Sequence, residues 1–165
     1  MAEIDNDVAA DVDVTEVLSE EEIRICLFSI GEETYAIPVD LLTEIIIPQK
    51  IFPVPTTPPH VLGVINLRGT IVPIVDIRPV LSQSKQSAPG QIAVVKHGAI
   101  TIGILVDTVS EVTVVPKNSV LTIPAEHGAQ AGKSRSRFFQ GIIQRETGLA
   151  ALLNIERIFK EITLT

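Results

Sequence analysis

The amino-acid sequence carries an internal duplication. One stretch repeats at an offset of 67 residues and another at an offset of 78, with matches that include Gly31 with Gly98, Asp40 with Asp107, Glu44 with Glu111, Gly63 with Gly141, and Ile74 with Leu152. The copies span about residues 23–81 and 90–162, and the difference of 11 places an insertion near residues 123–136, a Pro, Gly and Ser-rich segment typical of a surface loop. A half of about 60 to 75 residues buries too little surface to be stable alone. The duplication therefore predicts two halves that share a core.

Each copy has the composition of short β-strands. Isoleucine and valine account for 42 of the 165 residues (23 and 19), and their β-branched side chains favour the pleated, half-buried surface of a sheet. Runs at 23–30, 34–37, 64–67 and 70–75 are separated by glycine-containing turns, which predicts antiparallel hairpins. The fold class is therefore all-β with short helices. Because closing a sheet removes its exposed edges, we expect a pair of small barrels packed together.

Short helical segments are predicted between these strands. Asp40 and its copy Asp107 stand where a carboxylate can cap one or two helical turns, over residues 40–44 and 107–111. A Thr-Pro pair predicts another turn over residues 58–62. The clearest helix begins at Asn154, with residues 76–81 as its weaker copy. Its apolar residues have the i, i+3, i+4, i+7 spacing that buries one face: Ile155, Ile158, Phe159 and Ile162.

The negative charge is concentrated at the start of the chain. Residues 1–22 hold nine of the 20 acidic residues and no base, whereas 13 bases face 11 acids from residue 23 onward. We expect residues 1–22 to be a disordered acidic tail, because such a run buries too little apolar surface to offset its ordering cost. The first residues have neither the basic nor the apolar region of a signal peptide, which predicts a cytoplasmic protein.

Signals for membrane insertion, metal binding and catalysis are weak or missing. The longest stretch without a charge, residues 51–67, carries four prolines, so no direct membrane insertion is expected. The single cysteine, Cys26, and three scattered histidines form no ligand cluster, and we expect neither a metal nor a cofactor. Asp107 follows an apolar run as in aspartic proteases, but Val109 stands where those enzymes have glycine. The helix-cap interpretation is favoured, and no catalytic residue is assigned.

A single-stranded nucleic-acid-binding β-barrel is the alternative function. Such barrels stack bases on exposed aromatic side chains along a basic groove. This chain has no tryptophan, one tyrosine and five phenylalanines, and its one locally basic segment is formed by Lys133, Arg135 and Arg137. The acidic tail would also oppose binding to phosphate. We therefore expect no nucleic-acid partner.

The segment Asn66-Leu67-Arg68-Gly69 stands out at the tip of a predicted hairpin. An arginine in so apolar a context is expected to have a partner, because an unpaired buried charge is very costly. Glu44 is the candidate, since its copy Glu111 faces no equivalent arginine. The pair has two compatible interpretations: it ties the neighbouring turn to the hairpin, and it shapes a recognition surface.

The run from Pro59 to Arg78, with the Asn-Leu-Arg-Gly hairpin at its centre, resembles the signature of CheW-like chemotaxis coupling proteins, and the similarity extends over about residues 23–162. The resemblance implies two interlocked, SH3-like, five-stranded β-barrels that share a core. It also implies a non-catalytic adaptor between a methyl-accepting chemoreceptor and the regulatory domain of a chemotaxis-type histidine kinase, in chemotaxis, phototaxis or pilus-based motility. The positions that match the family's receptor groove and its support are Leu42, Glu44, Gly63, Asn66, Arg68 and Gly69.

Overall fold

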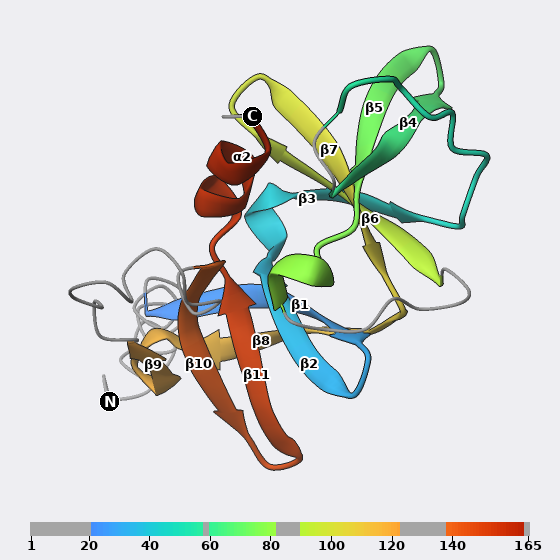
Figure 1. Cartoon of the computed structure of the whole chain (residues 1–165). Coiled ribbons are helices and arrows are strands. Elements are labelled where there is room, and N and C mark those ends of the chain that lie inside the picture. Colours follow the sequence, from blue (N-terminus) through green and yellow to red (C-terminus); the bar gives the residue numbers. More distant parts are fainter. Residues whose placement is uncertain (1–20, 58–59, 82–89, 123–137, 164–165) are drawn as a thin grey trace, which may run out of the picture.

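The computed structural model describes residues 21–57, 60–81, 90–122 and 138–163, and these form a mostly β structure (Figure 1). The described residues contain one α-helix, α2 (Ile155–Thr163), and three 3₁₀ turns, η1 (Val39–Leu41), η2 (Pro79–Leu81) and η3 (Lys117–Ser119). The strands are β1 (Glu22–Ile30), β2 (Glu33–Pro38), β3 (Leu42–Ile46), β4 (Val61–Leu67), β5 (Thr70–Val75), β6 (Gln91–His97), β7 (Ile100–Val106), β8 (Thr108–Pro116), β9 (Val120–Thr122), β10 (Phe139–Arg145) and β11 (Gly148–Leu153). The predicted fold class is confirmed.

The strands form two sheets, and each half of the chain contributes to both. One sheet has the order β8-β1-β2-β11-β10-β9 and the other has the order β3-β6-β7-β5-β4. The first half thus contributes β1 and β2 to the six-stranded sheet and β3 to β5 to the five-stranded sheet. The second half contributes β6 and β7 to the five-stranded sheet and β8 to β11 to the six-stranded sheet. The sixth strand of the larger sheet, β9, is three residues long and lies at the edge of that sheet. This exchange of strands interlocks the two barrels.

The offsets found in the sequence also relate the pairing of the strands. Ile74 pairs with Gly103 in the parallel β5–β7 ladder, and the residues 78 and 67 positions away, Leu152 and Ala36, pair in the parallel β11–β2 ladder. The antiparallel pairs follow the same rule. Strand β3 pairs with β6, and their equivalents, β8 and β1, pair with each other. The predicted antiparallel hairpins β1–β2 and β4–β5 are present. The two parallel ladders join segments from different halves, which local sequence patterns do not reveal.

Three apolar clusters fill this arrangement. One lies inside the five-stranded barrel and includes Ile65, Ile74 and Ile92. Another lies inside the six-stranded barrel and includes Leu27 and Ile143. The largest lies between the barrels and takes side chains from both sheets and from α2, including Phe28, Tyr35, Val95, Ile104, Leu153, Ile158 and Phe159. The shared core expected from the small size of each half is this third cluster.

A buried arginine supplements the shared cluster. Arg78 follows β5 and is 2% exposed, and its Nη2 donates to Oδ1 of Asp107 at 2.6 Å while its Nη1 donates to Oδ1 of Asp76 at 3.2 Å. The other oxygen of Asp107, Oδ2, accepts the backbone N–H of Gly31 in the β1–β2 turn at 2.7 Å. The network therefore joins the end of a five-stranded-barrel strand to a hairpin of the six-stranded barrel.

Of the predicted helical turns, the one over 107–111 is wrong, the one over 40–44 is present only as η1, and the one over 58–62 ends in a strand. Residues 42–46 form β3 and residues 108–116 form β8, so Glu44 and Glu111 lie on strands. Asp40 lies inside the short turn η1, which has no side-chain cap, and Asp107 is held by Arg78 instead of capping a helix. Within the predicted turn over 58–62, Val61 and Leu62 begin β4, and residues 58 and 59 are outside the described residues. Backbone pairing with a neighbouring strand outweighed a local capping signal.

The C-terminal helix follows the prediction, and the boundary of the N-terminal tail is corrected. Oδ1 of Asn154 accepts the backbone N–H of Arg157 at 3.0 Å, as expected of a helix cap. The weaker copy of this helix is reduced to η2. Glu22 belongs to β1, and the carbonyl of Glu21 accepts the N–H of Lys117 at 2.7 Å, so the tail predicted over residues 1–22 is two residues too long. Residues 1–20 and 123–137, and with them the predicted insertion, are outside the described residues.

The Arg78 network makes a testable prediction about stability. Replacing Arg78 by alanine leaves two carboxylates in a buried setting without their cation, which is expected to lower the free energy of unfolding by about 3–5 kcal/mol. Urea denaturation of the wild type, Arg78→Ala and the exposed control Arg157→Ala measures the loss. Equal, small losses in both variants would show that the network does not stabilise the fold.

Candidate partner-binding site

The tip of the β4–β5 hairpin has a backbone that its sequence explains. Leu67 pairs with Thr70, so Arg68 and Gly69 form a two-residue turn, with φ angles of 51° and 90°. Positive φ at both positions is the geometry that suits the twist of a hairpin, and glycine adopts it without steric cost. Oδ1 of Asn66 accepts the N–H of Gly69 at 2.8 Å and closes the turn. Asn66 and Gly69 therefore present Arg68 at a fixed place.

Arg68 reaches across the barrel to Glu44. Its Nη2 donates to Oε2 of Glu44, which lies on β3 opposite Val94 of β6. The predicted ion pair is present, but it is not buried: the side chains of Arg68 and Glu44 are 69% and 28% exposed. The expectation of an arginine enclosed in apolar surroundings is corrected, because the tip of the hairpin extends beyond the barrel core. The pair belongs to the surface and is open to a partner.

This pair borders a cavity of about 260 Å³ at one end of the five-stranded barrel, which we call the barrel mouth. The floor is apolar, formed by Leu67, Val72 and Val94, which also belong to the barrel core. The rim is polar and consists of Thr43, Glu44, Arg68, Thr70, Lys96 and Thr101. A small cavity with an apolar floor and a few convergent polar groups is a typical recognition site in a β-barrel.

The other two candidate residues serve the fold as well as the surface. Leu42 is partly buried and packs against the cluster between the barrels. Gly63 has φ 150°, and a Cβ atom at this position would overlap the carbonyl oxygen of Phe52, which accepts the N–H of Val64 at 2.9 Å. Gly63 therefore permits the close approach of the segment that precedes β4. Of the six candidates, Glu44 and Arg68 offer the charged groups of the site.

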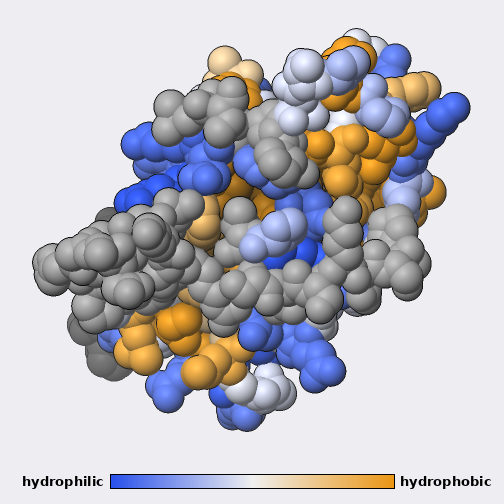
Figure 2. Space-filling view, viewed as in Figure 1, coloured by the Kyte–Doolittle hydropathy of each residue, from blue (hydrophilic) through white to orange (hydrophobic). Residues whose placement is uncertain are grey.

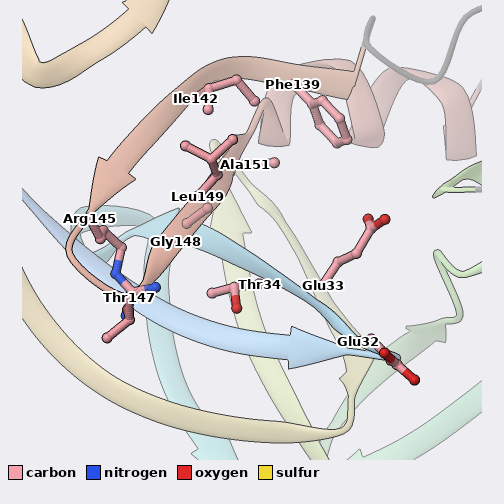
Figure 3. A pocket seen from close by; sticks show the side chains of 11 residues that line it. Glu32, Glu33, Thr34, Phe139, Ile142, Arg145, Thr147, Gly148, Leu149 and Ala151 are labelled. Carbon is pink, nitrogen blue, oxygen red and sulfur yellow. The ribbon is translucent and has the colours of Figure 1, made fainter.

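A second hollow, of about 570 Å³, lies on the six-stranded sheet between β2 and the β10–β11 hairpin (Figure 3). Phe139, Ile142 and Leu149 give it an apolar side, and Glu33 and Arg145 lie at its edges. Leu149 is 60% exposed and adds apolar surface to this hollow. Figure 1 places this hairpin at the end of the molecule opposite the β4–β5 hairpin. No sequence pattern indicated this surface, although its exposed leucine follows a glycine in the hairpin turn.

The hydrophobic colouring of the surface agrees with two separate faces. Figure 2 shows apolar surface in the region where Figure 1 places β4 and β5, and a second area over the lower part of the molecule near β10 and β11. Exposed apolar side chains on or next to the first hairpin include Phe52, Val54 and Ile71. Single exposed apolar residues are common on proteins, but gathered ones indicate interaction sites.

Among the residues that the structure describes, no group of three or more histidine, cysteine or carboxylate side chains is placed to hold a metal ion. No helix among the described residues is long and apolar enough to cross a membrane. Asp107, the one residue with an aspartic-protease-like setting in the sequence, is engaged by Arg78 and Gly31.

A family model described as a CheW-like domain matches residues 24–163, which includes both barrels and the barrel mouth. The chain belongs to the CheW-like family. It is 30% identical over 145 residues to a chemotaxis protein CheW of Helicobacter pylori, a match that covers 87% of this chain and 85% of the relative. The corresponding protein of Thermotoga maritima is 31% identical over 87% of this chain and 92% of its own length.

A solved structure and a more distant relative agree with this assignment. The crystal structure of a CheW scaffolding protein from Thermoanaerobacter tengcongensis superimposes with a TM-score of 0.71 and 27% sequence identity, covering 80% of this chain and 88% of that one. The protein FrzA of Myxococcus xanthus is more distant, at 23% identity over 81% of this chain and 82% of its own length. The CheW-like fold inferred from the Asn-Leu-Arg-Gly hairpin is confirmed.

The roles of the two glycines in this CheW-like chain can be separated by stability. Gly63→Ala is expected to lower the free energy of unfolding by more than about 2 kcal/mol, because overlap with the Phe52 carbonyl adds to the strain of positive φ. Gly69→Ala has open space around its Cβ and is expected to cost about 1–2 kcal/mol. Thermal unfolding of both variants tests the order, and a larger loss for Gly69→Ala would contradict it.

The Glu44–Arg68 pair is expected to contribute little to stability. Since Arg68 is mostly exposed, a double-mutant cycle with alanine should give a coupling energy of about 0.2–1 kcal/mol, decreasing as salt is added. Urea denaturation of the wild type, both single variants and the double variant measures it. A coupling near zero at low salt would mean that the two side chains do not meet in solution.

Proposed function

We infer that this CheW-like chain is an adaptor in chemotaxis-type signalling. The observation that carries the inference is the family match over residues 24–163. Relatives of similar length are named chemotaxis proteins, and the superimposed structure is titled a scaffolding protein. Two separate faces on one small molecule are what a scaffold needs in order to hold two proteins together. A scaffold acts by raising the effective concentration of one partner near the other.

We propose further that the partners are a methyl-accepting chemoreceptor and the regulatory domain of a chemotaxis-type histidine kinase, and that the protein works in the cytoplasm. The receptor is assigned to the surface around the barrel mouth, supported by the exposed Glu44–Arg68 pair and the apolar residues beside it. Leu42, Gly63, Asn66 and Gly69 support this surface through packing and turn geometry. The kinase is assigned to the hollow beside the β10–β11 hairpin, supported by exposed Leu149.

The adaptor has no catalytic role of its own in this proposal. The proposed work is to hold partners in register, for which binding surfaces suffice. A nucleic-acid-binding barrel is not favoured, because bases need aromatic platforms along a basic groove. Among the described aromatic residues Phe52 is 48% exposed, and its ring is covered from one side by Lys50 at 5.1 Å.

Substitutions on the two faces are expected to separate the two binding events. Arg68→Glu should weaken binding to the receptor's cytoplasmic fragment while leaving kinase binding largely intact, because the side chain is exposed and belongs to the β4–β5 hairpin, which lies at the opposite end of the molecule from the β10–β11 hairpin. Leu149→Asp should have the opposite effect, since it places a charge in an apolar contact. Separate calorimetric titrations of each purified partner measure the affinities.

Circular dichroism provides the control for folding in this experiment. Leu42→Asp is less suitable as a probe, because Leu42 packs against the shared cluster and its loss would act through stability. Equal loss of both affinities in a folded Arg68→Glu protein would refute separate faces. Failure of the wild type to bind either partner would refute the proposed function.

A further inference from the structure

Lys96 is a cation at the barrel mouth that the ion pair does not use. It lies on β6 two residues after Val94, so it shares the inner face of the sheet with Val94 and with Glu44, which pairs with Val94. Glu44 is engaged by Arg68. Within residues 21–57, 60–81, 90–122 and 138–163, no carboxylate forms a salt bridge with Lys96. The charged side chains of the mouth therefore sum to one positive charge.

The shape of the mouth is suited to a short acidic side chain. Its volume of about 260 Å³ is small, its floor of Leu67, Val72 and Val94 is apolar, and its rim is polar. The methylene groups of a glutamate can contact the floor while the carboxylate meets the ammonium group of Lys96, which has three donors. The hydroxyl groups of Thr70 and Thr101 on the same rim can donate to the second oxygen.

We propose that the barrel mouth is a recognition pocket for a glutamate or aspartate side chain of a protein partner, with Lys96 as the residue that selects the negative charge. This inference rests on the proposed function, because the carboxylate is assigned to a protein that the adaptor binds. One uncommitted cation balances one carboxylate, whereas a phosphate group carries nearly two charges and is usually held by several donors.

The equivalent end of the other half of the chain has the same backbone arrangement but a different net charge. The positions equivalent to Lys96, Arg68 and Glu44 are Ser29, Glu146 and Glu111. Arg145 stands in place of Leu67 there, so the charged side chains sum to one negative charge. The same backbone therefore presents opposite net charge at its two equivalent ends, and an acidic side chain is accepted at one of them.

The pocket can be tested on the full chain with a small probe. The blocked amino acid N-acetyl-glutamate amide is titrated into isotope-labelled protein, with N-acetyl-glutamine amide as the neutral probe of equal shape. Backbone amide signals of Thr70, Lys96 and Thr101 should shift with the glutamate probe and respond much less to the glutamine probe. Lys96→Gln should weaken binding of the glutamate probe about two- to fivefold, whereas the control Lys117→Gln, also exposed, should not.

The outcomes separate this inference from the proposed function. Equal shifts with both probes, or equal affinity in Lys96→Gln and wild type, would overturn the pocket even where the wild type binds its protein partners. Absence of partner binding by the wild type would overturn the proposed function whatever the probes show. In titrations with the receptor fragment and the kinase domain, Lys96→Gln should lose about two- to fivefold in affinity for the receptor fragment, which is the partner assigned to the barrel mouth, and Lys96→Arg should restore most of it. No loss for either partner would also overturn the inference.

Discussion

The connection between the two barrels depends most directly on the ion pair between the buried guanidinium group of Arg78 and the carboxylate of Asp107. Arg78 follows a strand of one barrel and holds Asp107, whose second oxygen accepts an N–H from the β1–β2 turn of the other. A charge with 2% exposure is tolerable only with such partners, because an unpaired buried ion is very costly. The geometry of these few groups therefore restricts the position of the β1–β2 hairpin relative to the β7–β8 junction. Around them the shared cluster supplies the bulk of the apolar burial.

Exchange of strands between the halves explains why the barrels cannot be separated. Each sheet contains a parallel ladder between segments from different halves, β5–β7 in one and β11–β2 in the other. Unfolding either half would leave both sheets with unpaired edges, which favours a single cooperative transition. This coupling also fixes the direction in which the β4–β5 and β10–β11 hairpins point. Fixed faces of this kind suit the proposed adaptor role, in which two partners are held in register.

Local sequence patterns predicted the β1–β2 and β4–β5 hairpins, the C-terminal helix and the turn at Gly69, because these depend on β-branched runs, a cap at Asn154 and a glycine at position 69. They failed at Asp40 and Asp107, where a capping signal competes with pairing to distant strands. The Glu44–Arg68 pair was predicted because an arginine in an apolar sequence context is expected to have a partner, but its exposure depends on how far the hairpin extends beyond the core. Lys96 gave no signal in the sequence, since only the β6–β3 register brings it to the same mouth as Glu44.

Duplication followed by divergence accounts for the different surfaces of the two barrels. The equivalent pairs Ile74–Gly103 and Leu152–Ala36 show that the backbone framework is shared, and buried positions such as Ile65 and Ile74 are matched by apolar Ile143 and Leu152. Surface positions are free to change because they are not constrained by packing. Charge can thus differ between equivalent ends, with Arg68 in one copy and Glu146 in the other. Two barrels of one fold then present distinct faces, as the proposed binding of two different proteins at separate sites requires.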